Sequence, residues 1–320
     1  MFWNERINPK TEPLKVLLKR GEFFDSARGR TIPFKLYYPA GEGLPDKVPV
    51  ILWSHGYGGN RDGAGFISRY VASHGYIIIH LTHTGSDSSL WEGKPGHPWD
   101  VLRRSPITRA MTVERFKDVP AVLDQLPNWA KENPEPGARM DLETLGMSGH
   151  SFGAMTTQAM AGENFPGDDD APAGELLSYK ENRFKAGIAY SPVPIRKLHG
   201  ETPEKHFYGP ISLPIFYMTG TNDDSPLEGF TYDRRVVVYD YTGAAEKYLL
   251  VLKNGDHMVY NGTRGKLEAN PLREPHEDFI KVMSLAFWEG YLKGDAAALA
   301  WLKDGAAAWV GAAGELKTPV

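Results

Sequence analysis

Short apolar runs that alternate with helix-forming segments are the feature that most restricts the fold of this 320-residue chain. The runs are rich in β-branched or aromatic residues, as expected of strands buried on both faces of a sheet. They occupy residues 48–53, 76–81, 142–147, 184–190, 214–218 and 248–252. The segments predicted to be helical are 65–73, 113–132, 154–162 and 279–293. Because the connections are long enough for parallel crossovers, the pattern predicts an α/β fold, with a mostly parallel central sheet flanked by helices.

The two ends of the chain carry patterns of their own. Residues 16–18 and 32–38 alternate in part, which predicts a pair of antiparallel strands within the N-terminal region 1–40. The alanine-rich segment that begins at residue 295 predicts a C-terminal helix and a frayed tail within 295–320. We interpret residues 1–320 as a single domain without a large cap.

Two segments fit neither pattern. Residues 85–107 and 164–177 are predicted to be loops, and the first is expected near the carboxyl edge of a strand, where ligands bind in such folds. The second contains the run Asp168-Asp169-Asp170. This run is interpreted as a solvated loop, because it lacks the glycine and the distant glutamate of a calcium-binding EF-hand.

Charge and composition exclude several classes of function. The formal net charge is -4, and no Lys/Arg-rich run is present, so a nucleic-acid partner is not expected. No apolar stretch approaches the roughly 18–20 residues of a membrane span, and the first residues do not resemble a signal peptide, so we expect a soluble protein. The chain has no cysteine, which rules out disulfides and thiolate nucleophiles but leaves the compartment open. Nothing in the sequence indicates an oligomeric state.

The segment Gly149-His150-Ser151-Phe152-Gly153 lies between a predicted strand and a predicted helix. Glycines two residues before and after a serine leave room for neighbouring backbone on a tight strand-to-helix turn. Such a turn exposes the serine hydroxyl as a nucleophile. Ser151 is therefore the candidate nucleophile.

A serine nucleophile needs a base and an acid, and this kind of fold supplies them in the chain order Ser, Asp, His. The turn after strand 214–218 contains Asp223 and Asp224, and the loop after strand 248–252 contains His257. Since neighbouring strands lie roughly 5 Å apart, loops from adjacent carboxyl edges can meet over Ser151. We favour Asp223 as the acid and keep Asp224 as the alternative, because a shift of one residue in a turn reverses a side chain.

Acyl transfer also needs N–H donors for the developing oxyanion. The N–H of Phe152 is one candidate. The second is expected in the glycine-rich loop 54–60 after strand 48–53, where we favour Tyr57 and keep Gly58 as the alternative. His55 in this loop is expected to bond loop backbone rather than to act as a second base.

The combination of these motifs resembles the α/β-hydrolase superfamily, in particular its predicted dienelactone-hydrolase and platelet-activating-factor acetylhydrolase-like branch. The resemblance spans about residues 30–288 and extends to bacterial cutinase-like polyester hydrolases. It implies a Ser-Asp-His carboxylic ester hydrolase without a cofactor, with oxyanion donors at Tyr57 and Phe152. Dienelactone hydrolases proper use a cysteine nucleophile, which this chain lacks, so their substrate is not carried over. The motifs are Ser54-His55-Gly56-Tyr57-Gly58-Gly59, His83-Thr84-Gly85-Ser86-Asp87, Gly149-His150-Ser151-Phe152-Gly153, Gly220-Thr221-Asn222-Asp223 and Asp256-His257-Met258.

The resulting hypothesis is a serine esterase for small-molecule or polymeric esters. Ligand sites are mostly apolar, so Trp91, Trp99, His150 and Gly58 are the candidate substrate-binding residues, and anchoring of the loop is the alternative role for Trp91 and Trp99. A serine peptidase or amidase is the alternative, although it usually needs an extra domain over the site. A catalytically silent binding protein is the other alternative, but such a protein normally lacks a triad member.

No metal is expected. His80, His83, His97 and Asp87 are close in sequence, but His80 and His83 at a strand end should point to opposite faces. Arg115 and Asp118, three residues apart on a predicted helix, are expected to form a non-catalytic pair.

Overall fold

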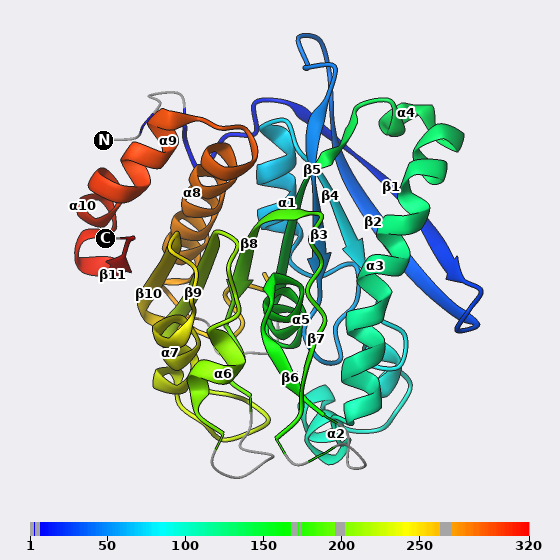
Figure 1. The fold of residues 1–320 in the computed structure, drawn as a ribbon. Helices are drawn as coiled ribbons and strands as arrows, with labels where there is room; N and C mark the ends of the chain where they lie inside the picture. The colour runs from blue at the N-terminus through cyan, green and yellow to red at the C-terminus, as the bar shows by residue number, and fades with distance from the viewer. Residues whose placement is uncertain are drawn as a thin grey trace.

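The computed structural model describes residues 3, 7–167, 172, 174–195, 202–262 and 270–319. Within these residues the chain forms a nine-stranded sheet with helices on both faces (Figure 1). The strand order is β1-β2-β4-β3-β5-β8-β9-β10-β11. A separate two-stranded sheet pairs β6 with β7.

The strands from β3 to β10 that form the centre of the sheet pair in parallel. Antiparallel pairs occur only towards the edges of the described sheet, at β1–β2, β2–β4 and β10–β11. The predicted α/β class and the mostly parallel sheet are therefore confirmed. The strands are β1 (Lys15–Asp25), β2 (Arg30–Ala40), β3 (Val48–Ser54), β4 (Ile77–Leu81), β5 (Met140–His150), β6 (Asn164–Pro166), β7 (Leu176–Ser178), β8 (Phe184–Tyr190), β9 (Ile215–Asn222), β10 (Lys247–Asp256) and β11 (Gly314–Lys317).

Helices and short helical turns connect these strands. The α-helices are α1 (Gly65–Ser73), α2 (Pro98–Arg104), α3 (Arg109–Glu132), α4 (Pro134–Gly137), α5 (Phe152–Ala161), α6 (Glu204–Tyr208), α7 (Tyr232–Tyr241), α8 (Arg273–Leu292), α9 (Ala296–Ala300) and α10 (Ala306–Val310). The other turns are η1 (Ser88–Leu90), the π-helical η2 (Trp301–Gly305) and η3 (Gly311–Ala313).

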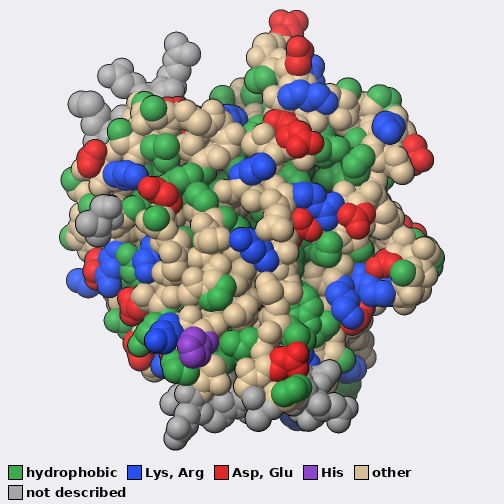
Figure 2. All heavy atoms as spheres, viewed as in Figure 1, with side chains coloured by type: hydrophobic (Ala, Val, Ile, Leu, Met, Phe, Trp, Pro, Cys, Tyr) green, Lys and Arg blue, Asp and Glu red, His purple; other side chains and the backbone are tan. Residues whose placement is uncertain are grey.

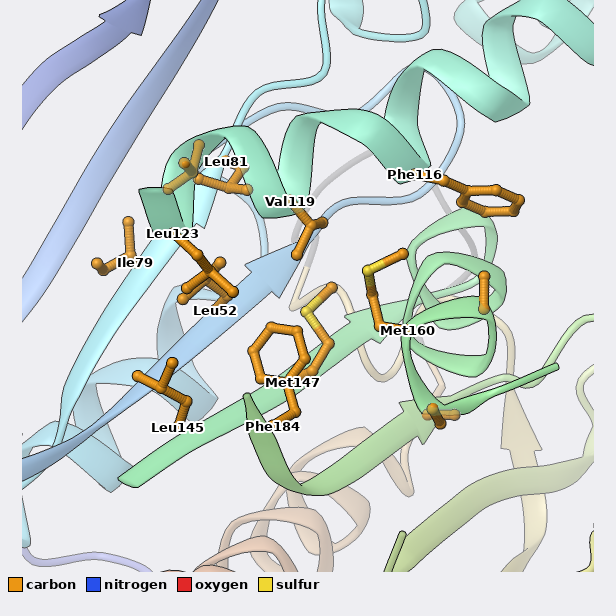
Figure 3. Packing of buried hydrophobic residues seen from close by; sticks show 14 of the residues in the cluster. Leu52, Ile79, Leu81, Phe116, Val119, Leu123, Leu145, Met147, Met160 and Phe184 are labelled. Atoms are coloured by element: carbon orange, nitrogen blue, oxygen red, sulfur yellow. The ribbon is translucent and has the colours of Figure 1, made fainter. Parts of the chain in front are cut away.

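The sheet separates two hydrophobic cores. On one face α3 and α5 cover the strands, and Val119, Leu123 and Met160 from these helices pack with strand residues Leu52 and Met147 (Figure 3). On the other face α1 and α8 supply the core of the second cluster. Strands covered on both sides explain why their sequences are continuous apolar runs rather than alternating ones.

Charged side chains of both signs are interspersed over the face of the molecule shown in Figure 2. This distribution agrees with the small net charge of -4. Among the described helices, none combines the length and the apolar character that crossing a bilayer would require.

Both segments that were predicted to be loops contain regular structure. Residues 85–107 include η1 and α2, and α2 is capped by His97, whose Nδ1 accepts the N–H of Trp99. Proline at the first helical position, here Pro98, is a helix-start signal that the loop interpretation overlooked. Residues 164–177 contain β6 and the start of β7. The run Asp168–Asp170 lies outside the described residues.

The C-terminal segment also differs from the prediction. The helical part breaks at η2 and η3, and the expected frayed tail forms β11, which pairs antiparallel with β10. Leu316 lies opposite Leu250 and packs against the second core cluster. Pairing with a strand that is distant in sequence explains why local composition missed this edge strand.

Truncation of Phe287 tests the second core. The ring is 0 % exposed and packs against Phe216 and Tyr248. We expect Phe287→Ala to lower the free energy of unfolding by about 3–5 kcal/mol, because it removes buried surface and leaves a cavity. Leu18→Ala is the control, since Leu18 is 49 % exposed. Chemical denaturation measures both, and equal stabilities of the two variants would contradict this description of the core.

Candidate active site

Ser151 occupies a strained turn between β5 and α5. Its backbone has φ 56° and ψ -117°, a conformation that non-glycine residues rarely adopt. Its N–H donates to the carbonyl oxygen of Tyr190 at 2.9 Å. The flanking glycines are sterically required, because a Cβ at Gly153 would collide with the Ser54 carbonyl and one at Gly149 with the Gly153 carbonyl. The turn thus holds the serine at the carboxyl edge of the sheet.

The structure brings Ser151, His257 and Asp223 together. His257 Nε2 lies 3.1 Å from Ser151 Oγ, and His257 Nδ1 lies 2.6 Å from Asp223 Oδ1. Nδ1 is approached by Asp223 Oδ1, which can only accept, and at 3.2 Å by Arg235 Nη2, which can only donate. The shorter contact to the carboxylate places the ring proton on Nδ1 and leaves Nε2 to accept the Ser151 hydroxyl. Asp224, the alternative acid, is exposed and accepts the N–H of Tyr232 at 3.3 Å. The geometry therefore places Asp223, and not Asp224, beside the imidazole.

Asp223 is fully buried between charged and polar partners. Arg235 Nε on α7 lies 3.1 Å from Asp223 Oδ1, and Thr219 Oγ1 donates to Oδ2 at 2.8 Å. Burial by itself would raise the pKa of Asp223, but Arg235 and His257 outweigh it and hold this pKa below its ordinary value. The carboxyl is therefore ionised at neutral pH and can stabilise a protonated imidazole.

Arg235 is a site residue that the sequence analysis missed. Its side chain is 1 % exposed, and it donates to the carbonyl oxygens of Asp223 at 2.7 Å, Pro192 at 3.0 Å and Ser191 at 3.2 Å. The helix α7 that carries it was itself not predicted. Its sequence contains no signal that separates the buried Arg235 from the neighbouring Arg234.

The loop after β3 lies directly against the serine turn. A Cβ added at Gly56 would be 3.4 Å from the Cβ of Ser151. The N–H of Gly58 donates to the Ser86 carbonyl at 2.9 Å, so the alternative oxyanion donor is already engaged. The N–H groups of Tyr57 and Phe152 donate to no acceptor among the described residues. These two groups are therefore the available donors beside Ser151.

A buried arginine connects the two donor segments. Arg115 on α3 is 0 % exposed, and it donates to Ser54 Oγ at 2.9 Å, to Ser86 Oγ at 2.9 Å and to the His55 carbonyl. Its guanidinium also lies 4.3 Å from the centre of the Phe152 ring. Arg115 thus contacts both the loop after β3 and the first residue of α5, and holds the two segments together.

The expected direct pair of Arg115 with Asp118 is not what the structure shows. Asp118 Oδ2 lies 2.9 Å from His83 Nδ1, and Asp118 forms ion pairs with Arg28 and Arg30. The Nε2 atom of His83 lies 2.9 Å from Ser54 Oγ. Although these residue types match a catalytic triad, the His83, Asp118 and Ser54 side chains are fully buried, so a substrate cannot reach them.

The other histidines take structural positions. His55 Nε2 accepts the N–H of His83 at 3.0 Å, and its Nδ1 lies 2.6 Å from the Gly56 carbonyl, in agreement with the expected bonding to loop backbone. His80 Nε2 lies 2.6 Å from Ser68 Oγ, far from the surface in the core. Within the described residues, no three histidine or acidic side chains gather as a metal site.

Two cavities meet at Ser151. We call the first the Phe165 cavity, with a volume of about 320 Å³, and the second the Trp99 cavity, with a volume of about 380 Å³. The candidate substrate-binding residues Gly58, His150, Trp91 and Trp99 all line the Trp99 cavity. The Phe165 cavity was not predicted; it is lined by Tyr57, Ile107, Thr108, Arg109, Thr112, Ser151, Phe152, Met155, Phe165, Gly167, Val193, Pro194, Ile195, Ser225, Pro226, Leu227, Glu228, Phe230 and Arg235.

Two of the predicted substrate-binding residues, Trp91 and His150, also form hydrogen bonds to backbone carbonyls of the site. Trp91 Nε1 donates to the Gly58 carbonyl at 2.7 Å, which fixes the indole against the glycine-rich loop. His150 Nε2 lies 2.8 Å from the carbonyl oxygen of His257. Burial holds the pKa of His150 well below its ordinary value, so this imidazole is neutral and donates to that carbonyl.

Comparison of the chain with models of known protein families and with curated proteins finds no match. A serine hydroxyl beside a histidine–aspartate pair, two N–H groups that have no acceptor among the described residues, and two adjoining cavities form an arrangement that could carry out acyl transfer.

The buried histidines predict how stability depends on pH. Burial lowers the pKa of His80 to about 3 and that of His83 to about 4, whereas both titrate near 6.5 when unfolded. Between pH 6.5 and 4 the unfolded chain binds protons that the folded chain does not. The free energy of unfolding should therefore fall as the pH is lowered, by up to about 1.4 kcal/mol per pH unit for each histidine.

Chemical denaturation between pH 4.5 and 7.5 measures this slope. His80→Gln should make it shallower by the contribution of one histidine. His206→Gln, at an exposed position, is the control for the substitution itself. An identical slope in the wild type and in His80→Gln would show that His80 is not held neutral by the fold.

Proposed function

We propose that the protein is a serine carboxylic ester hydrolase of the α/β-hydrolase type that acts through an acyl-enzyme intermediate. The observation that carries the proposal is the continuous hydrogen-bonded arrangement of Ser151, His257 and Asp223, with separations of 3.1 and 2.6 Å. The strained turn at Ser151 and the N–H groups of Tyr57 and Phe152 support it. The proposal requires no metal or organic cofactor.

The first half of the reaction forms the acyl-enzyme. His257 Nε2 takes the proton of Ser151 as its Oγ attacks the ester carbonyl carbon. The N–H groups of Tyr57 and Phe152 donate to the oxygen that becomes negative, and each such donor is worth roughly 2.7–4 kcal/mol of barrier. His257 then gives its proton to the departing alcohol oxygen as the carbon–oxygen bond breaks.

The second half releases the acid. Water gives a proton to His257 and attacks the acyl carbon, and the proton returns to Ser151 Oγ when the serine leaves. Asp223 keeps the imidazole in the required tautomer and stabilises its charged form in both halves. Since Arg235 and Thr219 hold the Asp223 carboxylate, they contribute to this orientation from outside the reacting groups.

The two cavities support esters that carry a substantial group on each side of the reacting carbonyl. Both cavities include Ser151 and Tyr57, so a bound ester can extend into each of them. At the Trp99 cavity, His97 is exposed and Trp99 is half-buried, which leaves this side accessible from solvent. This accessibility favours bulky and polymeric esters as substrates in addition to small ones.

Removal of the nucleophile is the direct test. Ser151→Ala should lower hydrolysis of p-nitrophenyl butyrate by about 10⁴-fold or more, because it removes the hydroxyl that lies 3.1 Å from His257 Nε2. A fluorophosphonate probe should label the wild type but not this variant. Turnover that survives in Ser151→Ala would refute the proposal, and an unlabelled wild type would favour a silent binding protein. Comparable cleavage of the matching p-nitroanilide would favour the amidase alternative.

The two neighbouring aspartates form a matched pair of variants. Asp223→Asn should reduce kcat by about 10³–10⁴-fold, because the amide disfavours the tautomer that activates Ser151. Asp224→Asn should retain nearly all activity, since this side chain is exposed and its partner among the described residues is the N–H of Tyr232. Steady-state kinetics compares them, and a larger loss in Asp224→Asn would reverse the assignment of the acid.

A further inference from the structure

The two cavities differ in their relation to the imidazole. His257 and Met258 line the Trp99 cavity, whereas neither is among the described residues that line the Phe165 cavity. Ser151 lines both, and its Oγ is 3.1 Å from His257 Nε2. The Trp99 cavity is thus on the imidazole side of the nucleophile, and the Phe165 cavity is on the other side.

The chemistry of ester cleavage assigns a role to each side. When the bond between the acyl carbon and the alcohol oxygen breaks, its electron pair stays on that oxygen, which takes the proton from His257 Nε2. This transfer requires the oxygen to be within about 2.6–3.2 Å of Nε2, so the group attached to it must lie on the imidazole side. The carbonyl oxygen is held by the N–H groups of Tyr57 and Phe152. The acyl substituent on the reacting carbon must therefore extend in the direction that these two groups do not occupy, away from His257.

We propose that the Phe165 cavity binds the acyl part of the substrate and that the Trp99 cavity binds an aromatic alcohol part. This inference rests on the proposed esterase function and adds the orientation and chemical class of the substrate. The preferred substrate is then an ester of an apolar carboxylic acid with a phenol or an aryl-substituted alcohol.

The walls of the Phe165 cavity indicate an uncharged acyl chain. Met155, Phe165 and Ile107 present apolar surface to it. The cavity also contains Arg109 and Arg235, but protein groups engage both guanidiniums. That of Arg109 donates to the Pro166 carbonyl and lies 5.0 Å from the Phe165 ring centre, and that of Arg235 donates to the three carbonyl oxygens described above.

The walls of the Trp99 cavity indicate an aromatic partner. Trp91 and Trp99 are both half-buried and line this cavity, so part of each indole is accessible. The bond from Trp91 Nε1 to the Gly58 carbonyl orients one of them in advance. Aromatic rings gain from offset or edge-to-face contact with such side chains beyond the burial of area.

Two pairs of esters separate the two sides. The acyl pair is p-nitrophenyl acetate and p-nitrophenyl octanoate, which share one leaving group. The alcohol pair is benzyl acetate and cyclohexylmethyl acetate, which share one acyl group and have alcohols of similar size. The quantity compared is the ratio of kcat/KM within each pair, measured by absorbance for the first pair and by pH-stat for the second. The wild type should favour octanoate and benzyl acetate.

Variants that fill the Phe165 cavity test its role. Met155→Trp should reduce the octanoate-to-acetate ratio by about tenfold, because the indole occupies the space of the longer chain. Ile107→Trp fills the same cavity from the loop before α3 and provides the test if Met155→Trp does not fold. Neither variant should move the benzyl-to-cyclohexylmethyl ratio. Met155→Leu conserves volume and is the matched control.

A variant that removes the aromatic wall tests the other side. Trp99→Ala should reduce the benzyl-to-cyclohexylmethyl ratio by about five- to tenfold and leave the octanoate-to-acetate ratio in place. Arg104→Ala is the control, because Arg104 is exposed on the same helix and does not line either cavity.

The outcomes separate this inference from the function on which it rests. A change of the benzyl ratio in Met155→Trp or Ile107→Trp, or of the octanoate ratio in Trp99→Ala, would reverse the assigned orientation. If both the octanoate-to-acetate and the benzyl-to-cyclohexylmethyl ratios stay constant in all variants, the assigned roles of the two cavities are wrong. The same holds if activity on all four esters falls by the same factor. In either case the loss of turnover in Ser151→Ala would still support the esterase, whereas retained turnover in Ser151→Ala would remove its basis.

Discussion

Parallel pairing of β3 with β5 is the constraint on which the rest of the site depends. In this register Ser54, the last residue of β3, lies opposite Gly149, so the loop after β3 leaves the sheet beside the serine turn. The approach is so close that Gly153 has no room for a Cβ against the Ser54 carbonyl. The two N–H groups beside Ser151 are therefore a consequence of strand register, and not of either loop alone.

The same edge of the sheet collects the remaining groups. β8, β9 and β10 continue the parallel order, and their carboxyl ends carry Ser191, Asp223 and His257. Because neighbouring strands lie about 5 Å apart, the loops that leave their carboxyl ends can bring side chains from several strands to one point. Groups separated by about a hundred residues in sequence thus meet within 3.1 Å.

Two buried arginines, one on α3 and one on α7, secure this arrangement. Arg115 binds groups of the loop after β3 and contacts the Phe152 ring, while Arg235 binds the Asp223 carboxylate and nearby carbonyls. Burying a guanidinium is costly unless its donors are satisfied, so each arginine strongly favours the one geometry in which its acceptors surround it. The two arginines thus hold the loop after β3 and the Asp223 carboxylate in place, which is the kind of preorganisation that the proposed acyl transfer would require.

The sequence by itself determined the features that depend on local pattern: the α/β class, the parallel order of the buried strands, the serine turn, and the placement of Asp223 and His257 after successive strands. These were readable because buried strands, glycine-dependent turns and strand ends leave local signatures. Only the tertiary structure placed Asp223 rather than Asp224 beside His257, engaged the N–H of Gly58, buried Arg115 and Arg235, added β11 to the sheet and formed the Phe165 cavity. Each of these depends on contacts between segments far apart in the chain, where the partner of a side chain is set by packing, and residue type and spacing contain no record of it.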